Sequence, residues 1–209
     1  MPDPTTSRSN PSYSNATLLT MARPRLAQPV KLICGLLGGD VDLLRRARQL
    51  LVRRFGPVDL ESDLWPFDQT DYYEAEMGPD LKRLFLAFEQ LIRPDLLAGT
   101  KDETNQIEQR IAADCAALEI PRPVNLDPGY IDLGKLVLAT TKDRSHRLYL
   151  GQGIYAEVTL HFVDKRWQVW PWTYPDYHRP EYHAFFHRAR DRLREQRRQP
   201  AGPFSETDS

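Results

Sequence analysis

The residues best suited to chemistry lie close together in the C-terminal third of the chain. His146 is the candidate general base because of its location among these residues. Its neighbours Arg147 and Lys142 could stabilise a developing negative charge. Glu157 follows on the same stretch and supplies a carboxylate. We therefore take His146 and Glu157 as the candidate catalytic residues.

A wider set of polar side chains could bind a ligand near these two residues. Cations among phenolic side chains suit phosphate groups, since phosphoryl chemistry mostly requires positioning and charge neutralisation. Carboxylates in the set could bind magnesium through their oxygen atoms, although the sequence does not say which residues would ligate a metal. The candidate ligand-binding residues are Lys135, Lys142, Arg147, Tyr149, Tyr155, Asp127, Tyr130, Asp71, Tyr72, Glu76 and Asn105.

An antiparallel hairpin is expected to position the centre of this set. Residues 147–162 alternate with a period of two, and Gly151-Gln152-Gly153 is the expected turn. The expected cross-strand pairs are Arg147 with Glu157, Leu148 with Ala156, Tyr149 with Tyr155 and Leu150 with Ile154. The face expected to pack on the core carries Leu148, Leu150, Ala156, Val158, Leu160 and Phe162. The opposite, polar face carries Arg147, Tyr149, Tyr155, Glu157, Thr159 and His161.

A second turn at Asp164-Lys165 extends this hairpin to a three-stranded meander. In that register Phe162 faces Trp167 and Leu160 faces Val169, so apolar residues continue to meet. The polar face of the meander is the expected ligand site. The alternative is that Arg147 and Glu157 form an ordinary cross-strand ion pair, worth up to about 1 kcal/mol.

Six segments of the chain resemble the signature of one bacterial family. They are DYYEAEMG at 71–78, TNQIE at 104–108, NLDPGY at 125–130, KLVLATTKD at 135–143, HRLYLGQGIYAEVTL at 146–160 and PWTYPDY at 171–177. That family is catalogued as domain of unknown function 4416, and the likeness covers residues 30–190. The resemblance implies membership of the family, and it implies no activity, substrate or catalytic residue.

Length and composition favour one globular domain. The chain has 209 residues, of which 41% are apolar, enough for a proper core. Its 28 Lys and Arg residues nearly balance 29 Asp and Glu residues, so bulk charge does not attract it to nucleic acid or membranes. Cys34 and Cys115 lack metal-binding spacing, which is typical of free thiols in a reducing compartment. With no signal sequence and no membrane-spanning run, we expect a cytoplasmic protein.

The order of the remaining elements predicts the fold class. Before the meander we expect strands at 30–37 and 58–64, a helix from the cap Asp40 to Phe55, and a helix from a Thr100–Glu103 capping box to Leu118. Residues 81–91 fit a strand or a helix, and we choose a strand. A strand from Val124 would end at an Asp127-Pro128-Gly129 turn, whereas residues 133–140 could be strand or helix.

This order predicts an α+β fold. Strand, helix, strand, strand, helix, strand is typical of a ferredoxin-like split βαβ sandwich, here extended by the C-terminal antiparallel β-meander and a terminal helix. The helix begins near Pro180 and buries Tyr182, Phe185, Phe186, Ala189 and Leu193. Residues 30–198 form the single domain. Residues 1–29, with an alternative start at Met21, and residues 199–209 are expected to be a disordered extension and tail.

Two motif-based functions can be set aside. The segment GLLGGDVD at 35–42 lacks the Lys and the hydroxyl residue of a phosphate-binding P-loop, which excludes a P-loop GTPase. His183 and His187 lie four apart on the terminal helix, a spacing that can hold a metal. The Glu of a HExxH motif is missing between them, so we expect a solvated helix face instead.

Three functional hypotheses follow. The first is a protein that binds a phosphate-bearing, nucleotide-like small molecule on the polar face of the meander, with or without metal-assisted hydrolase or transferase activity. The second is an RNA-binding or ribosome-associated module, suggested by the ferredoxin-like order, Tyr149, Tyr155 and two Arg-rich helices. The third is a structural or partner-binding protein. Whether the protein is an enzyme stays open.

Overall fold

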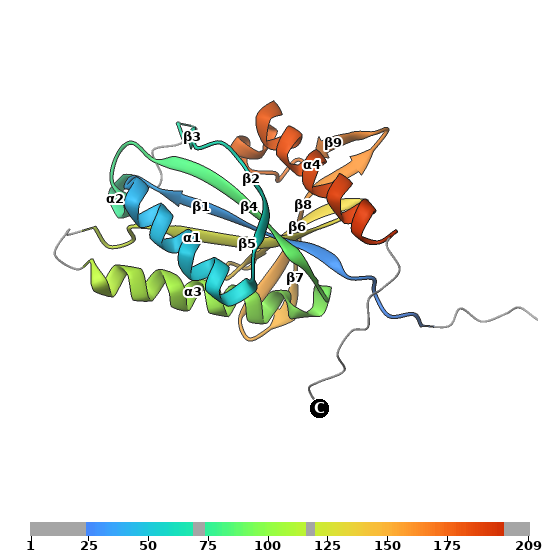
Figure 1. Ribbon diagram of the computed structural model, residues 1–209, viewed down its shortest axis with the longest axis horizontal. Coiled ribbons are helices and arrows are strands. Elements are labelled where there is room, and N and C mark those ends of the chain that lie inside the picture. Colours follow the sequence, from blue (N-terminus) through green and yellow to red (C-terminus); the bar gives the residue numbers. More distant parts are fainter. Residues whose placement is uncertain (1–23, 69–73, 116–119, 199–209) are drawn as a thin grey trace, which may run out of the picture.

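The computed structural model describes residues 24–68, 74–115 and 120–198. Within these ranges the chain forms an α+β fold, with one nine-stranded sheet and three long helices (Figure 1). The strands are β1 (Val30–Gly38), β2 (Val58–Glu61), β3 (Trp65–Pro66), β4 (Lys82–Ile92), β5 (Asn125–Asp132), β6 (Lys135–Thr140), β7 (Arg147–Gly151), β8 (Ile154–Val163) and β9 (Arg166–Val169). The helices are α1 (Val41–Phe55), the short α2 (Glu74–Met77), α3 (Leu97–Asp114) and α4 (Pro180–Gln196), with 3-10 turns η2 (Pro94–Leu96) and η4 (Pro175–His178).

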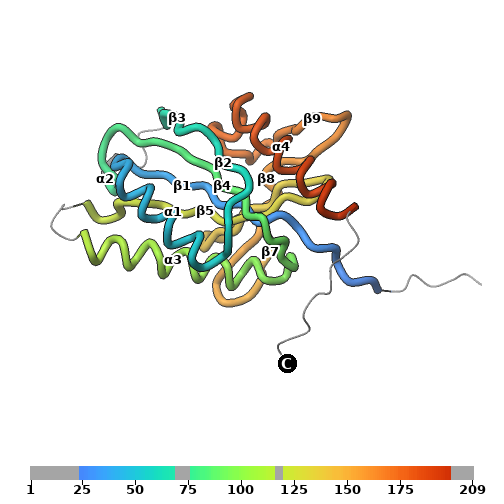
Figure 2. Tube along the Cα trace, in the orientation of Figure 1, coloured from blue at the N-terminus to red at the C-terminus, as the bar shows by residue number. Residues whose placement is uncertain are grey.

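The strands pair in the order β2-β4-β1-β5-β6-β8-β7, and the recorded pairings are antiparallel. β3 adds to β4, and β9 adds to β8. Figure 2 shows β7 and β9 at opposite ends of the long β8 ribbon, because β7 pairs with its first half and β9 with its second. Both expected hairpins of the meander are therefore confirmed, but β7 and β9 lie along the same edge of β8, because the other edge pairs with β6 over both halves.

Helices cover the two faces of the sheet. α1 and α3 lie side by side over one face (Figure 1), where Leu44, Leu51 and Ile111 pack against β1, β4 and β5. α1 begins as expected, since the Asp40 carboxylate accepts hydrogen bonds from the N–H groups of Asp42 and Leu43. No helix in the described residues is long and apolar enough to cross a membrane.

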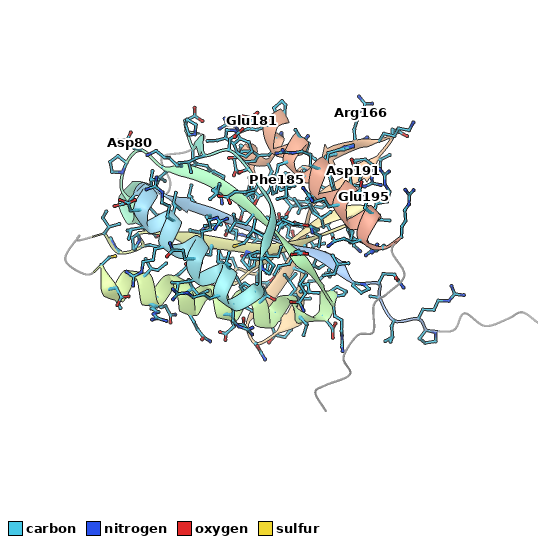
Figure 3. All side chains as sticks on the ribbon, viewed as in Figure 1. Asp80, Arg166, Glu181, Phe185, Asp191 and Glu195 are labelled. Atoms are coloured by element: carbon cyan, nitrogen blue, oxygen red, sulfur yellow. The ribbon has the colours of Figure 1, made fainter. Side chains whose placement is uncertain are left out.

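α4 covers the other face through the apolar stripe expected from the sequence. Its residues Tyr182, Phe185, Phe186, Ala189 and Leu193 are all fully buried. Phe185 is labelled in Figure 3 together with Asp191 and Glu195, which lie further along the same helix. The rings of Phe185 and Phe186 pack on Phe85 of β4 at centroid distances of 5.7 and 5.0 Å. The terminal helix therefore belongs to the main core.

Two ambiguous segments are strands. Residues 82–92 form β4 and residues 135–140 form β6. β4 lies between β2 and β1, so residues 83–88 are buried on both faces of the sheet and lose a clean alternation. That burial on both faces explains why the apolar pattern also fitted a helix.

Two expected boundaries are wrong. α3 begins at Leu97, and the Thr100 hydroxyl donates to the carbonyl of Leu96 instead of capping the helix, because η2 runs directly into α3. Asp127-Pro128-Gly129 is part of β5 and makes no turn. Pairing of β5 with β6 begins only at Gly129, so Pro128 lies past the end of that ladder, where its missing N–H is tolerated.

The single apolar face expected for the meander is also wrong. Leu136 of β6 faces Leu160, whereas Val137 faces Val158, so Thr159 is the extra residue of a β-bulge. Before the bulge, Ala156 and Val158 pack on the α3 side of the sheet. After it, residues 160 and 162 pack on the α4 side. One extra residue thus exchanges the two faces of β8.

The first hairpin carries a second bulge, between Tyr149 and Gly151 of β7. Arg147, Leu148 and Tyr149 pair as expected, but Gly151 takes the place opposite Ile154 that was expected for Leu150. β7 is an edge strand, and its Leu148 and Leu150 are 72% and 42% exposed. Conversely, Glu157 and Thr159 of the expected polar face are buried at 2% and 0% exposure. The candidate site is therefore more enclosed than the sequence indicated.

Candidate functional site

A cavity of about 550 Å³ lies on the face of the sheet that also carries α4. Its walls come from β4 to β8, from the segment 174–177 and from one end of α3. The cationic side chains that line it are Arg83, Lys101, Arg122, Lys142, Arg144 and Arg147. The lining carboxylates are Asp127, Glu157 and Asp176, so cations exceed carboxylates by three. Such a cavity attracts anions, because positive charge is concentrated in a concave site.

Arg147 and Glu157 form the meander end of the cavity. Strand pairing places them opposite each other, and Arg147 Nε donates to Glu157 Oε2 at 2.9 Å. Arg147 Nη2 donates to the hydroxyl of Tyr174 at 2.8 Å, and Nη1 donates to the carbonyl of Lys142 at 2.8 Å. Both charged side chains are almost completely buried. Glu157, Tyr174 and the Lys142 backbone therefore hold the guanidinium in one orientation.

His146 supports this pair from outside the cavity. Its Nε2 lies 3.1 Å from Glu157 Oε2, and its ring stacks on Trp172 with a centroid distance of 5.2 Å. The other oxygen of Glu157 accepts a hydrogen bond from Thr159 Oγ1 at 3.2 Å. With both carboxylate oxygens engaged, Glu157 is arranged to anchor Arg147. A catalytic role for His146 and Glu157 stays a prediction.

A second charged cluster forms the opposite end of the cavity. Arg83 Nη1 donates to Asp127 Oδ2 at 2.9 Å, and Arg83 Nη2 lies 3.5 Å from Asp176 Oδ2. Asn125 Nδ2 also donates to Asp127 Oδ2, at 2.8 Å. Arg83 itself is almost completely buried. Three segments that are distant in sequence therefore meet at one guanidinium.

The pKa values of the two carboxyl groups in this cluster are shifted in opposite directions. Burial raises the pKa of Asp176, and the attraction of Arg83 only partly offsets it. Burial also disfavours the charge of Asp127, but Arg83, Lys101 and the Asn125 amide outweigh it and lower the pKa of Asp127. For Arg83, burial opposes the charge, yet the two carboxylates raise its pKa above the ordinary value. Arg83 and Asp127 are therefore held in their charged forms.

Gly35 of β1 makes room for this cluster. A Cβ atom at Gly35 would lie 3.2 Å from Arg83 Nη1 and 3.0 Å from the Phe85 ring. Gly35 pairs with Phe85 on one side and with Asp127 on the other. The missing side chain thus lets the guanidinium pass over β1 toward β5.

Glu108 of α3 braces the start of β5 beside the cavity. Its Oε1 accepts from the N–H of Leu126 at 2.7 Å, and its Oε2 accepts from Arg122 Nη2 at 2.9 Å. Lys101 Nζ donates to the carbonyl of Leu126 at 2.7 Å. Burial raises the pKa of Glu108, and the charges of Lys101 and Arg122 oppose that effect. These contacts orient two of the cavity's cations.

Four of the expected site residues line the cavity, namely Asp127, Lys142, Arg147 and Glu157. Tyr130 lies on the opposite face of the sheet, where it packs beside Val137 and Leu97. Asp71 and Tyr72 lie outside the described residues. The remaining expected residues are described but do not line the cavity: His146 beside Glu157, Lys135 at the far end of β6, Tyr149 and Tyr155 on the meander, Asn105 on α3 and Glu76 on α2.

The sequence reasoning missed Arg83, Asp176 and Tyr177. Arg83 interrupts an otherwise apolar strand. A charged residue in such a run indicates a buried charge, and this was the one sign in the sequence that could have identified Arg83. Asp176 and Tyr177 belong to the PWTYPDY segment, whose sequence does not indicate a role in a site. Their position depends on how η4 lies against β4 and β5, which local patterns do not indicate.

The described residues contain no group of three or more His, Cys, Asp or Glu side chains that could hold a metal ion. His183 Nε2 lies 2.8 Å from the carbonyl oxygen of Tyr177, and His187 lies beside Asp191.

Comparison with known proteins identifies a family. A family model described as "Domain of unknown function (DUF4416)" matches residues 28–193, which include all the strands, α4 through Leu193 and the whole cavity. No curated protein matches the chain.

Proposed function

The chain belongs to the DUF4416 family, and we propose that it binds a phosphate-bearing small molecule in the cavity between the meander and β4. One observation carries the proposal: three cations, Lys142, Arg144 and Arg147, line the meander end of the cavity against a single carboxylate, Glu157. A cavity of this volume is typical of small-molecule sites. The excess positive charge favours an anionic ligand.

Arg147 is the expected anchor for the phosphate. A guanidinium carries five N–H donors in a rigid fork, and Arg147 makes three hydrogen bonds to the protein. Donors therefore remain for a ligand, while the protein contacts fix their direction. A positioned guanidinium suits phosphate because two parallel hydrogen bonds can form at once. Lys142 and Arg144, both exposed at the rim, would add further positive charge.

Binding is better supported than any particular reaction. Both oxygens of Glu157 accept hydrogen bonds within the protein, so it is not a free general base. Metal-assisted hydrolysis or transfer would need magnesium brought with the ligand, since the described residues hold no metal cluster. The proposal is therefore a binding function, with magnesium tested alongside.

RNA binding is the weaker alternative. The strand order β2-β4-β1-β5 supports the expected ferredoxin-like arrangement, which stays a prediction. However, Arg46, Arg48 and Arg54 of the Arg-rich helix α1 form ion pairs with carboxylates. Paired arginines are less available to phosphates of a nucleic acid.

Thermal unfolding in the presence of candidate ligands tests the proposal. Nucleotides, sugar phosphates and inorganic phosphate, each with and without magnesium, should include at least one that raises the Tm, because a ligand of the folded state stabilises it. The double variant Lys142→Ala with Arg144→Ala should weaken that ligand about tenfold or more. Arg53→Ala is the matched control, since Arg53 is an exposed arginine of α1 on the opposite face. If no phosphate compound raises the Tm, or if the control weakens binding equally, the proposal is wrong.

A further inference from the structure

We propose that the end of the cavity formed by Arg83, Asp127, Asp176 and Tyr177 binds the hydroxyl groups of a sugar, so that the ligand is a sugar phosphate, either free or as part of a nucleotide. This inference rests on the proposed function, because the phosphate would occupy the meander end. It names the chemical class of the rest of the ligand.

The two ends of the cavity differ in charge. The meander end has three cations and one carboxylate. At the opposite end the cations Arg83, Lys101 and Arg122 are balanced by three carboxylates, because Asp127 and Asp176 pair with Arg83 and Glu108 pairs with Lys101 and Arg122. A second phosphate would find no excess of positive charge at this end, since each cation there already has a carboxylate partner. A neutral polar group that can donate hydrogen bonds to carboxylates is favoured. The cavity therefore suits a ligand with an anionic head and an uncharged polar body.

Asp127 offers an acceptor to such a group. Its Oδ2 accepts from both Arg83 and Asn125, while its Oδ1 has no hydrogen-bond partner within the described part of the chain. The Asp127 side chain keeps 28% of its surface exposed, although the neighbouring Arg83 and Asp176 are enclosed. A ligand hydroxyl can donate to this oxygen without displacing a protein contact.

Two polar atoms at the same end lack a partner. Arg83 Nε and the Tyr177 hydroxyl make no hydrogen bond to any described residue, although both side chains are more than nine-tenths buried and line the cavity. Buried polar atoms in folded proteins are normally paired, so these two require an explanation. A hydroxyl group both donates and accepts. Adjacent hydroxyls could therefore pair with the carboxylate and, after a small side-chain rotation, with these two atoms.

A nucleobase has little to stack on at this end. Arg83 lies over the ring of Phe67 at 5.3 Å. The Tyr177 ring stacks on Phe186 with an interplanar angle of 6° and meets Phe85 edge to face. The aromatic faces at this end of the cavity are therefore already in use, which favours hydroxyl recognition over base stacking there.

Calorimetric titration of the full chain with matched phosphates tests this inference. Ribose 5-phosphate should bind about tenfold or more tightly than pentyl phosphate, which has the same phosphate but no hydroxyl groups. Tyr177→Phe removes one unpaired hydroxyl and should weaken ribose 5-phosphate about three- to tenfold while leaving pentyl phosphate unchanged. Tyr182→Phe is the matched control, because its buried hydroxyl also lacks a partner but Tyr182 does not line the cavity.

The outcomes separate this inference from the proposed function. If both phosphates bind equally, or Tyr177→Phe and Tyr182→Phe behave alike, hydroxyl recognition is wrong and phosphate binding survives. If neither phosphate binds, both are wrong. Adenosine monophosphate distinguishes the two sources of the sugar: tighter binding than ribose 5-phosphate, with the same loss in Tyr177→Phe, supports a nucleotide's ribose. Tighter binding that Tyr177→Phe does not change would overturn the inference.

Discussion

Arg83 on β4 and Asp127 on β5 form a 2.9 Å ion pair across the strand that separates them. The intervening strand β1 carries Gly35 at this point, and the guanidinium lies over it. Arg83 and Asp176 are almost completely buried, so this cluster contributes to the stability of the fold as well as being a candidate binding surface. It joins β4, β5 and η4 at one end of the cavity.

Gly35→Ala should destabilise the protein. A new methyl group would lie too close to Arg83 Nη1 and Phe85, so one of them must move, and overpacking of this kind costs about 1–3 kcal/mol. Gly134→Ala is the control, since nothing lies within 4 Å of a Cβ there. Urea unfolding of the two variants measures the difference in the free energy of unfolding. Equal stabilities would mean that Gly35 is not needed for the passage of Arg83.

The buried ion pair between Arg147 and Glu157 should contribute more to the free energy of unfolding than an ion pair on the surface does. Glu157→Gln leaves the enclosed guanidinium of Arg147 without its countercharge, and breaking a buried pair in this way costs about 3–5 kcal/mol. Glu61→Gln breaks the pair with Arg48, in which both side chains are 37% exposed, and should cost about 1 kcal/mol or less. Chemical denaturation at low and high salt compares them. If Glu157→Gln lowers the free energy of unfolding only slightly, water reaches the Arg147–Glu157 pair and the pair is not buried in solution.

The raised pKa of Asp176 should make the free energy of unfolding depend on pH. Its pKa is raised by burial, so the folded protein holds this proton more tightly than the unfolded chain, whose aspartates titrate near about 3.9. As pH rises from about 4, the unfolded state ionises first, and the wild-type protein loses stability relative to Asp176→Asn until the pH passes the raised pKa. Unfolding free energies from pH 4 to 7 measure this difference. Asp63→Asn, which removes one exposed carboxylate, serves as the control.

The bulge at Thr159 predicts unequal costs for two leucines that were expected on one face. Leu160→Ala should cost about 2–5 kcal/mol, since Leu160 is fully buried under α4. Leu148→Ala should change the stability by about 0.5 kcal/mol or less, because Leu148 is 72% exposed on the edge strand β7. Thermal or urea unfolding compares them directly. A large loss for Leu148→Ala would indicate that this edge is covered in solution.

The sequence by itself determined the elements whose signals are local. The period of two places Arg147 opposite Glu157 and Phe162 opposite Trp167, and the helical period selects the buried stripe of α4. Turn residues and caps lie near what they organise, as Asp40 does at α1. The segments that resemble DUF4416 also lie within the matched residues 28–193. These features need only neighbouring residues, so a single sequence shows them.

Only the tertiary structure decided which of these residues form a cavity. Arg83, Asp127 and Asp176 come from β4, β5 and η4, and no local pattern states that these segments meet. One extra residue at Thr159 reversed the faces of β8, and an edge position left Leu148 exposed despite its apolar character. Strand pairing and packing depend on the whole chain, since a contact between distant segments gains free energy only when the surrounding core has formed.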